Sequence, residues 1–147
     1  MEELKNFGFY VYICKKITII DPHLEEIMEN WTLIWTKLTS LKKTNINTIP
    51  TKTAGAYRLS YKHEDGNYYI YFVGESADLR KTLMEHLDNE VNACLLSYNN
   101  YDRFFRYAII SEEYVRKATI GVMYNNYKPA CNEVIPLFRE DIIVNLN

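Results

Sequence analysis

Two short strand-like runs separated by a turn signal constrain the fold of this chain more than any other feature of its sequence. Residues 55–61 read GAYRLSY and residues 67–74 read NYYIYFVG, and both runs are rich in aromatic and β-branched residues. The segment His63-Glu64-Asp65-Gly66 between them is typical of a turn. Together they predict an antiparallel hairpin.

The segments after the hairpin alternate between helical and strand patterns. Ser76 is placed to cap a helix over residues 77–97, along which leucine or valine recurs every four residues. Residues 104–110 read as a third strand, and 112–126 as a second helix. The apolar run at 141–144 predicts a short strand or a helical turn. The β-β-α-β-α order indicates an α+β fold with a small mixed, mostly antiparallel sheet and helices packed on it.

The first 50 residues predict an extension of that unit by a strand and a helix. Residues 7–20 read as strand, or as a hairpin with its turn at Lys15-Lys16. Residues 22–39 carry apolar side chains at helical spacing, with two tryptophans among them, and predict an amphipathic helix. Polar residues 40–54 then read as a connector. We therefore expect an N-terminal extension over 1–50 and a second unit over 51–147.

The composition is that of a globular protein with an unusual aromatic content. Of 147 residues, 48% are apolar and 24% charged, and the net charge of −2 argues against a broad basic face for nucleic acid. The chain has 13 tyrosines, 6 phenylalanines and 2 tryptophans. They indicate either a tyrosine-rich core or a stacking or contact surface, and the sequence leaves both interpretations open.

The cysteines and the apolar runs bear on the compartment. Cys14, Cys94 and Cys131 are far apart and odd in number, which fits neither a disulfide framework nor a zinc site and favours a reducing compartment. The sequence shows no secretory signal and no apolar run long enough to span a membrane. We expect a cytoplasmic protein without a membrane partner.

The ordered motifs of residues 50–133 resemble those of the GIY-YIG endonuclease superfamily. The motifs are GAY at 55–57, FVG at 72–74 followed by Glu-Ser, a helix beginning LRKTLMEHL, a third strand, and a helix ending YKPACN. The resemblance implies a β-β-α-β-α core that hydrolyses phosphodiester bonds with one divalent metal. Two tyrosines, an arginine, and a metal-binding glutamate on the second helix carry that chemistry in the family.

Residue by residue, the resemblance marks retained and replaced positions. Tyr57, His86 and Asn132 are retained. Phe72 occupies the position of the second tyrosine. Thr82, eight residues after Gly74, occupies the position of the arginine. Nine residues before Pro129, Ile120 stands for the glutamate. The replaced positions are those that hold the metal, carry charge or relay a proton.

Neighbouring residues offer little replacement for the lost groups. Arg80 lies about 200° around the helix from Thr82 and faces elsewhere. Glu75, directly after Gly74, is the one remaining candidate metal ligand, against the alternative of a solvated acid in a first helical turn. We expect no cofactor, and Mg²⁺ or Mn²⁺ if the domain is active.

The sequence thus predicts a nuclease-like domain that has lost catalysis and acts as a binding module. Nucleic acid, a nucleotide-derived ligand or a protein segment are its candidate partners. One alternative is an active, divergent metal-dependent endonuclease with rearranged residues. Another is a protein-interaction or assembly module, including a homo-oligomer. We further expect the six retained and replaced positions to line one cleft.

Overall fold

The chain folds around a four-stranded antiparallel sheet. The structure is a computed structural model that describes residues 2–6, 9–13, 15–21 and 26–146, with side chains from residue 28 onward. The strand order is β5-β8-β6-β7, formed by β5 (Thr39–Ser40), β8 (Arg103–Ile109), β6 (Gly55–Lys62) and β7 (Tyr68–Ser76). This sheet and the helices on it confirm the α+β fold class expected from the sequence.

The hairpin that the sequence predicts supplies an inner strand, β6, and an edge strand, β7, of this sheet. Strands β6 and β7 pair antiparallel from Gly55 opposite Ser76 to Lys62 opposite Tyr68, with a register shift after Leu59. In the turn, the Asp65 carboxylate accepts a hydrogen bond from the Asn67 amide at 2.8 Å. Gly66 has a φ of 84°, a conformation that other residues rarely adopt.

The predicted helix over 77–97 is wrong in length, because the chain forms two helices there. Helix α2 spans Leu79–Asp88 and α3 spans Ala93–Leu96. The N-cap of α2 is Asp78, which accepts from the Lys81 amide, and not Ser76. Asn92 caps α3 by accepting from the Leu95 amide. Short polar side chains that accept from backbone amides in this way mark the start of a helix, so the cap at Asn92 begins a second one.

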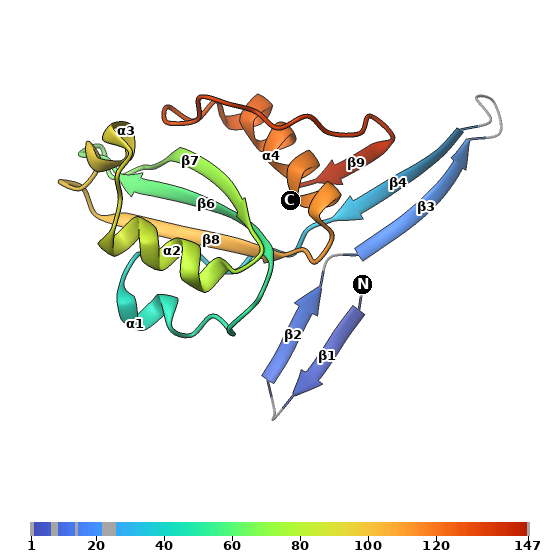
Figure 1. Cartoon of the computed structure of the whole chain (residues 1–147), viewed down its shortest axis with the longest axis horizontal. Helices are drawn as coiled ribbons and strands as arrows, with labels where there is room; N and C mark the ends of the chain where they lie inside the picture. The colour runs from blue at the N-terminus through green and yellow to red at the C-terminus, as the bar shows by residue number, and fades with distance from the viewer. Residues whose placement is uncertain (1, 7–8, 14, 22–25, 147) are drawn as a thin grey trace.

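The helices cover both faces of the sheet (Figure 1). Helix α1 (Lys43–Ile46) and α2 pack on the face of β6 that carries Tyr57 and Leu59. Helix α4 (Glu113–Tyr127) packs on the opposite face, against Ala56 of β6 and Val73 of β7. Two apolar clusters result, one on each side of the sheet. None of the described helices has the length and apolar run that a membrane crossing requires.

Residues 26–32 form a strand, so the predicted helix over 22–39 is wrong. Strand β4 (Glu26–Thr32) pairs antiparallel with β3 (Lys15–Asp21) and parallel with β9 (Ile142–Asn145), which the sequence had left as a strand or a helical turn. Trp31 and Leu33 are buried. The spacing of four between Trp31 and Trp35 also fits the two-residue period of a strand, which explains the error. Residues 22–25 lie outside the described residues.

The N-terminal hairpin differs from the one predicted. It is formed by β1 (Glu2–Asn6) and β2 (Phe9–Ile13), which pair antiparallel. The predicted turn at Lys15-Lys16 is wrong, because both lysines belong to β3 and pair with β4. The division of the chain at residue 50 stays a prediction.

Many of the tyrosines pack against one another. The Tyr61 ring centroid lies 4.7, 4.9, 5.9 and 6.1 Å from those of Tyr101, Tyr98, Tyr69 and Tyr71. This cluster joins the turn end of the β6–β7 hairpin to the segment after α3. It favours the interpretation of the aromatic content as packing.

Replacing Gly74 by alanine should destabilise the protein. A Cβ at this position would overlap the Tyr57 ring, so the two strands would have to shift. We expect the free energy of unfolding to fall by about 1–3 kcal/mol, as in other overpacked cores. A urea titration measures this change.

Gly66→Asn is the matched control for that substitution. Nothing lies within 4 Å of a Cβ placed at Gly66, and asparagine tolerates the left-handed backbone. The left-handed φ still strains asparagine, so we expect a loss of up to about 1 kcal/mol, smaller than that of Gly74→Ala. Equal losses in the two variants would contradict the argument from the Tyr57 contact.

Candidate functional site

Tyr57 lies between the central hairpin and α2. Its ring crosses Gly74, the residue opposite it on β7, and only 3% of the residue is exposed. Its hydroxyl reaches α2, where it lies 2.7 Å from His86 Nε2. The two glycine-containing motifs are thus adjacent in space, and together they orient this one hydroxyl group.

A carboxylate that the sequence analysis missed completes a relay with Tyr57. His86 Nδ1 lies 2.6 Å from Glu90 Oε1. A carboxylate only accepts hydrogen bonds, so His86 donates from Nδ1, and Nε2 of the neutral ring then accepts from the Tyr57 hydroxyl. The signal was present in the sequence as a histidine and a glutamate four residues apart.

Tyr57 keeps its proton over the ordinary pH range. Burial raises the pKa of Tyr57 far above its usual value, and the negative charges of Glu90 and Glu75 add to this effect. The relay therefore holds a neutral phenol as a hydrogen-bond donor. It orients Tyr57 and His86 rather than generating a phenolate.

A cleft of about 320 Å³ opens beside Tyr57, between β7, α4 and the segment after α4. Its walls are mostly apolar: Phe72, Val73, Ile120, Val134 and Pro136. Its polar groups are Tyr57, Glu75, Lys117, Asn132 and Glu133. This mixture of an apolar wall and a few polar groups is the usual form of a small-ligand pocket.

Asn132 fixes one wall of this cleft to the sheet. Its side-chain amide donates to the Val73 carbonyl at 2.8 Å and accepts from the Val73 amide at 2.9 Å. The side chain thus pairs with β7 as a neighbouring strand would. This explains why an asparagine is retained here even if the site performs no chemistry.

Four of the six expected positions line the cleft: Tyr57, Phe72, Ile120 and Asn132. His86 lies behind the Tyr57 hydroxyl, with its ring centroid 5.5 Å from that of Phe72. Thr82 is not part of the cleft lining. Its hydroxyl lies 2.6 Å from the Ser76 hydroxyl at the start of α2. The expectation of one cleft lined by all six is therefore wrong for Thr82 and His86.

The residues around the cleft do not fit a magnesium site of the usual kind. Mg²⁺ and Mn²⁺ prefer carboxylate oxygens, and the buried side chain at the expected ligand position is Ile120. The Glu75 carboxylate is 2.6 Å from Arg116 Nε. The Arg116 guanidinium also donates to the carbonyls of Ile110 and Ser111. Across the part of the chain that the structure describes, no group of three histidine, cysteine, aspartate or glutamate residues is placed to hold a metal.

The cations near the site differ in what they can still bind. Arg116 is 7% exposed and committed to Glu75, and Arg80 donates to the Asn47 carbonyl on another face. Lys117 lies on the cleft rim, and its ammonium group pairs with the exposed Glu113 at 2.9 Å. Exposed pairs of this kind are weak. An anionic ligand in the cleft can therefore bind Lys117 by breaking only this weak ion pair.

The expectation that the cysteines form no disulfide is wrong for one pair. Cys94 of α3 and Cys131 are bonded, across 37 positions of sequence. Cys131 is buried, as one half of this bond. Its amide also donates to the Tyr71 carbonyl at 2.9 Å. Cys14 lies outside the described residues.

Comparisons with known proteins bear on the fold. No family model and no curated protein matches this chain. Among solved structures, it is similar to the GIY-YIG N-terminal endonuclease domain of UvrC from Thermotoga maritima. The magnesium-bound form is 14% identical with a TM-score of 0.47, and a tyrosine-to-phenylalanine mutant bound to its divalent cation is 14% identical with a TM-score of 0.48. Each match covers 63% of this chain and 100% of that domain. These domains are named GIY-YIG, and the motifs of this chain resemble those of the family with that name. The likeness between the structures concerns the fold alone.

Asn132→Ala should weaken the attachment of the cleft wall. It leaves both backbone groups of Val73 without their partner, so the free energy of unfolding should fall by about 2 kcal/mol. Asn99→Ala, at an exposed loop position, serves as the control and should change it by less than about 0.5 kcal/mol. Thermal and urea unfolding measure both, and equal values would contradict the bracing role.

The buried tyrosines should make the protein less stable at alkaline pH. Burial raises the pKa of Tyr71 from near 10 to about 12. Between these two values the unfolded chain loses a proton that the folded chain retains, so stability falls as pH rises. Tyr71→Phe should reduce this slope by about 1.4 kcal/mol per pH unit. Urea titrations between those pH values test this, and an unchanged slope would contradict it.

Proposed function

We propose that this chain is a nuclease-like domain that binds a nucleic-acid segment in the cleft beside Tyr57 without cutting it. The observation that carries the proposal is the chemistry of the cleft walls. The frame around Tyr57 is intact, whereas Ile120 occupies the ligand position and Arg116 engages the Glu75 carboxylate. A site of this kind can hold a ligand but supplies little stabilisation of developing phosphate charge.

The cleft offers three means of holding nucleic acid. The Phe72 ring, 6.1 Å from the Tyr57 ring, provides an aromatic wall against which a base can stack. The Lys117 ammonium group provides a positive charge for a phosphate. The volume of about 320 Å³ is at the lower end for ligand pockets, so it accommodates a single nucleotide unit or a similar ligand. A free nucleotide-derived ligand would use the same contacts.

We also propose the cytoplasmic location that the sequence predicts. Cytosolic thiols are kept reduced, and the disulfides of cytosolic proteins are usually transient, so this location predicts a Cys94–Cys131 bond that is readily reduced.

An active endonuclease is the second candidate, and the Tyr57–His86–Glu90 relay favours it. The two hydrogen bonds of 2.7 and 2.6 Å arrange a hydroxyl, an imidazole and a carboxylate in sequence, as in sites that move protons. The relay also suits a binding module, because it fixes the Tyr57 side chain in the lining of the cleft.

A protein partner is the third candidate, and an exposed apolar segment favours it. Val134 and Leu137 are 80% and 96% exposed, and Ile135 and Phe138 between and after them are also exposed. This segment borders the cleft. Light scattering after size exclusion tests self-association, and a monomer at micromolar concentration would exclude the homo-oligomer.

The unaltered chain should not cut DNA with Mg²⁺ or Mn²⁺. Ile120→Glu alone should not restore cleavage, because the charge stabilisation would still be absent. The triple change Phe72→Tyr, Thr82→Arg and Ile120→Glu returns all three replaced groups and is assayed beside the single variant, although residue 82 lies outside the cleft lining. Gel assays with end-labelled single- and double-stranded DNA measure this. Metal-dependent cutting by the unaltered chain, abolished by Tyr57→Phe, would replace the proposal by the second candidate.

Binding is measured on the same DNA by fluorescence anisotropy. Lys117→Ala should reduce the affinity about fivefold and lower the salt dependence of binding by about one counterion. Lys43→Ala, on α1 away from the cleft, is the control and should change neither quantity. Absence of binding to DNA, RNA and mononucleotides would overturn the proposal.

A further inference from the structure

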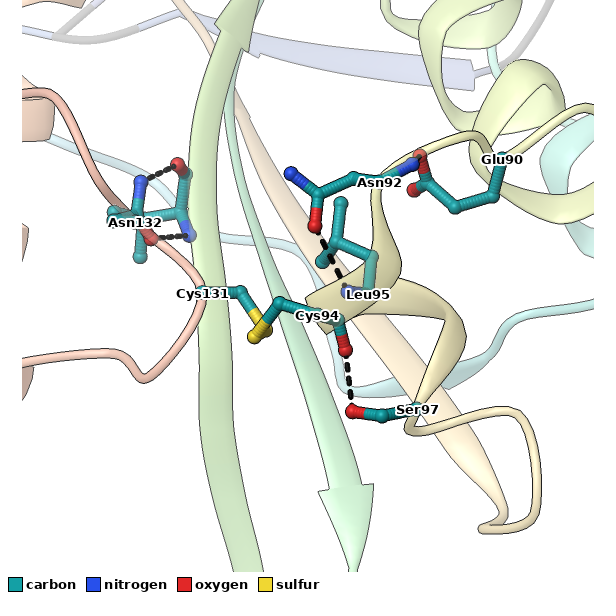
Figure 2. The surroundings of a disulfide bond; sticks show 8 residues. Glu90, Asn92, Cys94, Leu95, Ser97, Cys131 and Asn132 are labelled. Atoms are coloured by element: carbon teal, nitrogen blue, oxygen red, sulfur yellow. Dashed lines mark hydrogen bonds between the residues drawn. A yellow bond between two sulfur atoms is a disulfide. The ribbon is translucent and has the colours of Figure 1, made fainter.

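The Cys94–Cys131 disulfide joins the two segments that flank the site. Cys94 belongs to α3, and Cys131 precedes Asn132 directly (Figure 2). One segment supplies Glu90 to the relay, and the other forms a wall of the cleft. The disulfide is the only covalent connection between them besides the main chain in the part of the chain that the structure describes.

On the α3 side, Glu90 couples the disulfide-bearing helix to Tyr57. One of its carboxylate oxygens contacts His86 at 2.6 Å. The other accepts from the amides of Val91 and Asn92, at 3.1 and 3.2 Å, just before α3 begins. The backbone that leads into α3 thus determines where Glu90 meets His86.

On the Cys131 side, the bond holds the cleft wall. Asn132 pairs with Val73 through both atoms of its amide, and residues 133–136 continue along the cleft. Cys131 itself is 2% exposed. Beyond Asn132 this wall is largely exposed, so few other contacts restrain it.

We propose that the Cys94–Cys131 disulfide is a redox-controlled clamp that holds the relay and the cleft wall in their binding geometry. Its effect on a ligand rests on the proposed function, whereas its effect on the two segments does not. When the bond is broken, α3 has four residues and lacks its covalent anchor. A helix this short is not stable by itself, so the position of Glu90 becomes less restricted.

A dithiol reductant opens the clamp from the Cys94 side. Cys131 is buried and Cys94 is partly exposed, so the reductant's thiolate attacks Cys94 Sγ. The Sγ–Sγ bond breaks, and Cys131 leaves as a thiolate and takes up a proton. The second thiol of the reductant then displaces Cys94. The reductant becomes a disulfide and the protein gains two thiols, so electrons and protons balance.

Hydrogen exchange followed by mass spectrometry tests the clamp without any ligand. Treatment of the full chain with dithiothreitol should increase exchange about tenfold in peptides covering residues 89–97 and 131–136. Peptides of β8 should not change. Equal exchange in the oxidised and reduced protein would overturn the proposal.

Two variants separate the bond from other effects of the reductant. Cys94→Ser with Cys131→Ser should exchange like the reduced protein, with or without dithiothreitol. Cys14→Ser keeps the disulfide and should respond like the unaltered chain. If the double variant does not fold, the comparison of oxidised and reduced unaltered protein still decides.

A labelled single-stranded DNA oligonucleotide tests the consequence for the cleft. The oxidised protein should bind it about five- to tenfold more tightly than the reduced protein. By linkage, saturating DNA should then protect the bond against reduction by the same factor. Equal affinities would overturn the control of binding. Absence of binding in both forms would overturn the proposed function, while the exchange result would still decide whether the clamp exists.

Discussion

The geometry of the site depends on the close approach of the Tyr57 ring to the backbone of Gly74. A side chain at residue 74 would occupy the space that the Tyr57 ring fills. The ring can therefore cross the neighbouring strand β7 only because residue 74 is a glycine. Gly55, which lies two residues before Tyr57 on β6, also permits a close approach. A Cβ there would overlap the Ala108 carbonyl and come within 2.8 Å of Leu79. The motif glycines therefore serve packing, and their retention is independent of catalysis.

The charges around the cleft are balanced within the protein itself. Arg116 is buried, and the Glu75 carboxylate together with two backbone carbonyls satisfies its guanidinium. Removing the Glu75 carboxylate would leave the buried Arg116 charge without its ion partner, which costs more than a surface ion pair contributes. Glu75 is thereby committed to a structural role. The Glu90 carboxylate is likewise divided between His86 and the backbone before α3. The carboxylates nearest Tyr57 thus organise the protein, and this agrees with a site that binds without metal-dependent chemistry.

The local sequence pattern predicted the fold correctly where it fitted only one type of secondary structure. It failed where the same spacing of apolar residues fitted both a helix and a strand. The hairpin carries a turn signal and two strand-like runs, and it was predicted with its correct pairing. The tryptophans at 31 and 35 are separated by four residues, which suits one face of a helix and one face of a strand equally. Strand β4 forms because β3 and β9 lie on its two sides, and β9 is more than a hundred residues away. Of the six positions expected at the site, Tyr57, Phe72, Ile120 and Asn132 line one cleft. Thr82 did not, because the Ser76 hydroxyl holds it at the start of α2.

The disulfide shows why a contact between distant segments is the hardest feature to infer from one sequence. Cys94 and Cys131 are separated by a strand and a helix, and nothing in their local sequence pairs them. They meet because α3 and the segment after α4 both come to β7, where Tyr98 stacks on Tyr71 at 4.4 Å and the Cys131 amide bonds to the Tyr71 carbonyl. The aromatic packing and the backbone hydrogen bond thus lie beside the covalent bond and hold parts of the same two segments on β7. Because these contacts do not include the two sulfur atoms, the bond can respond to the thiol balance of its surroundings while the sheet beneath it remains in place.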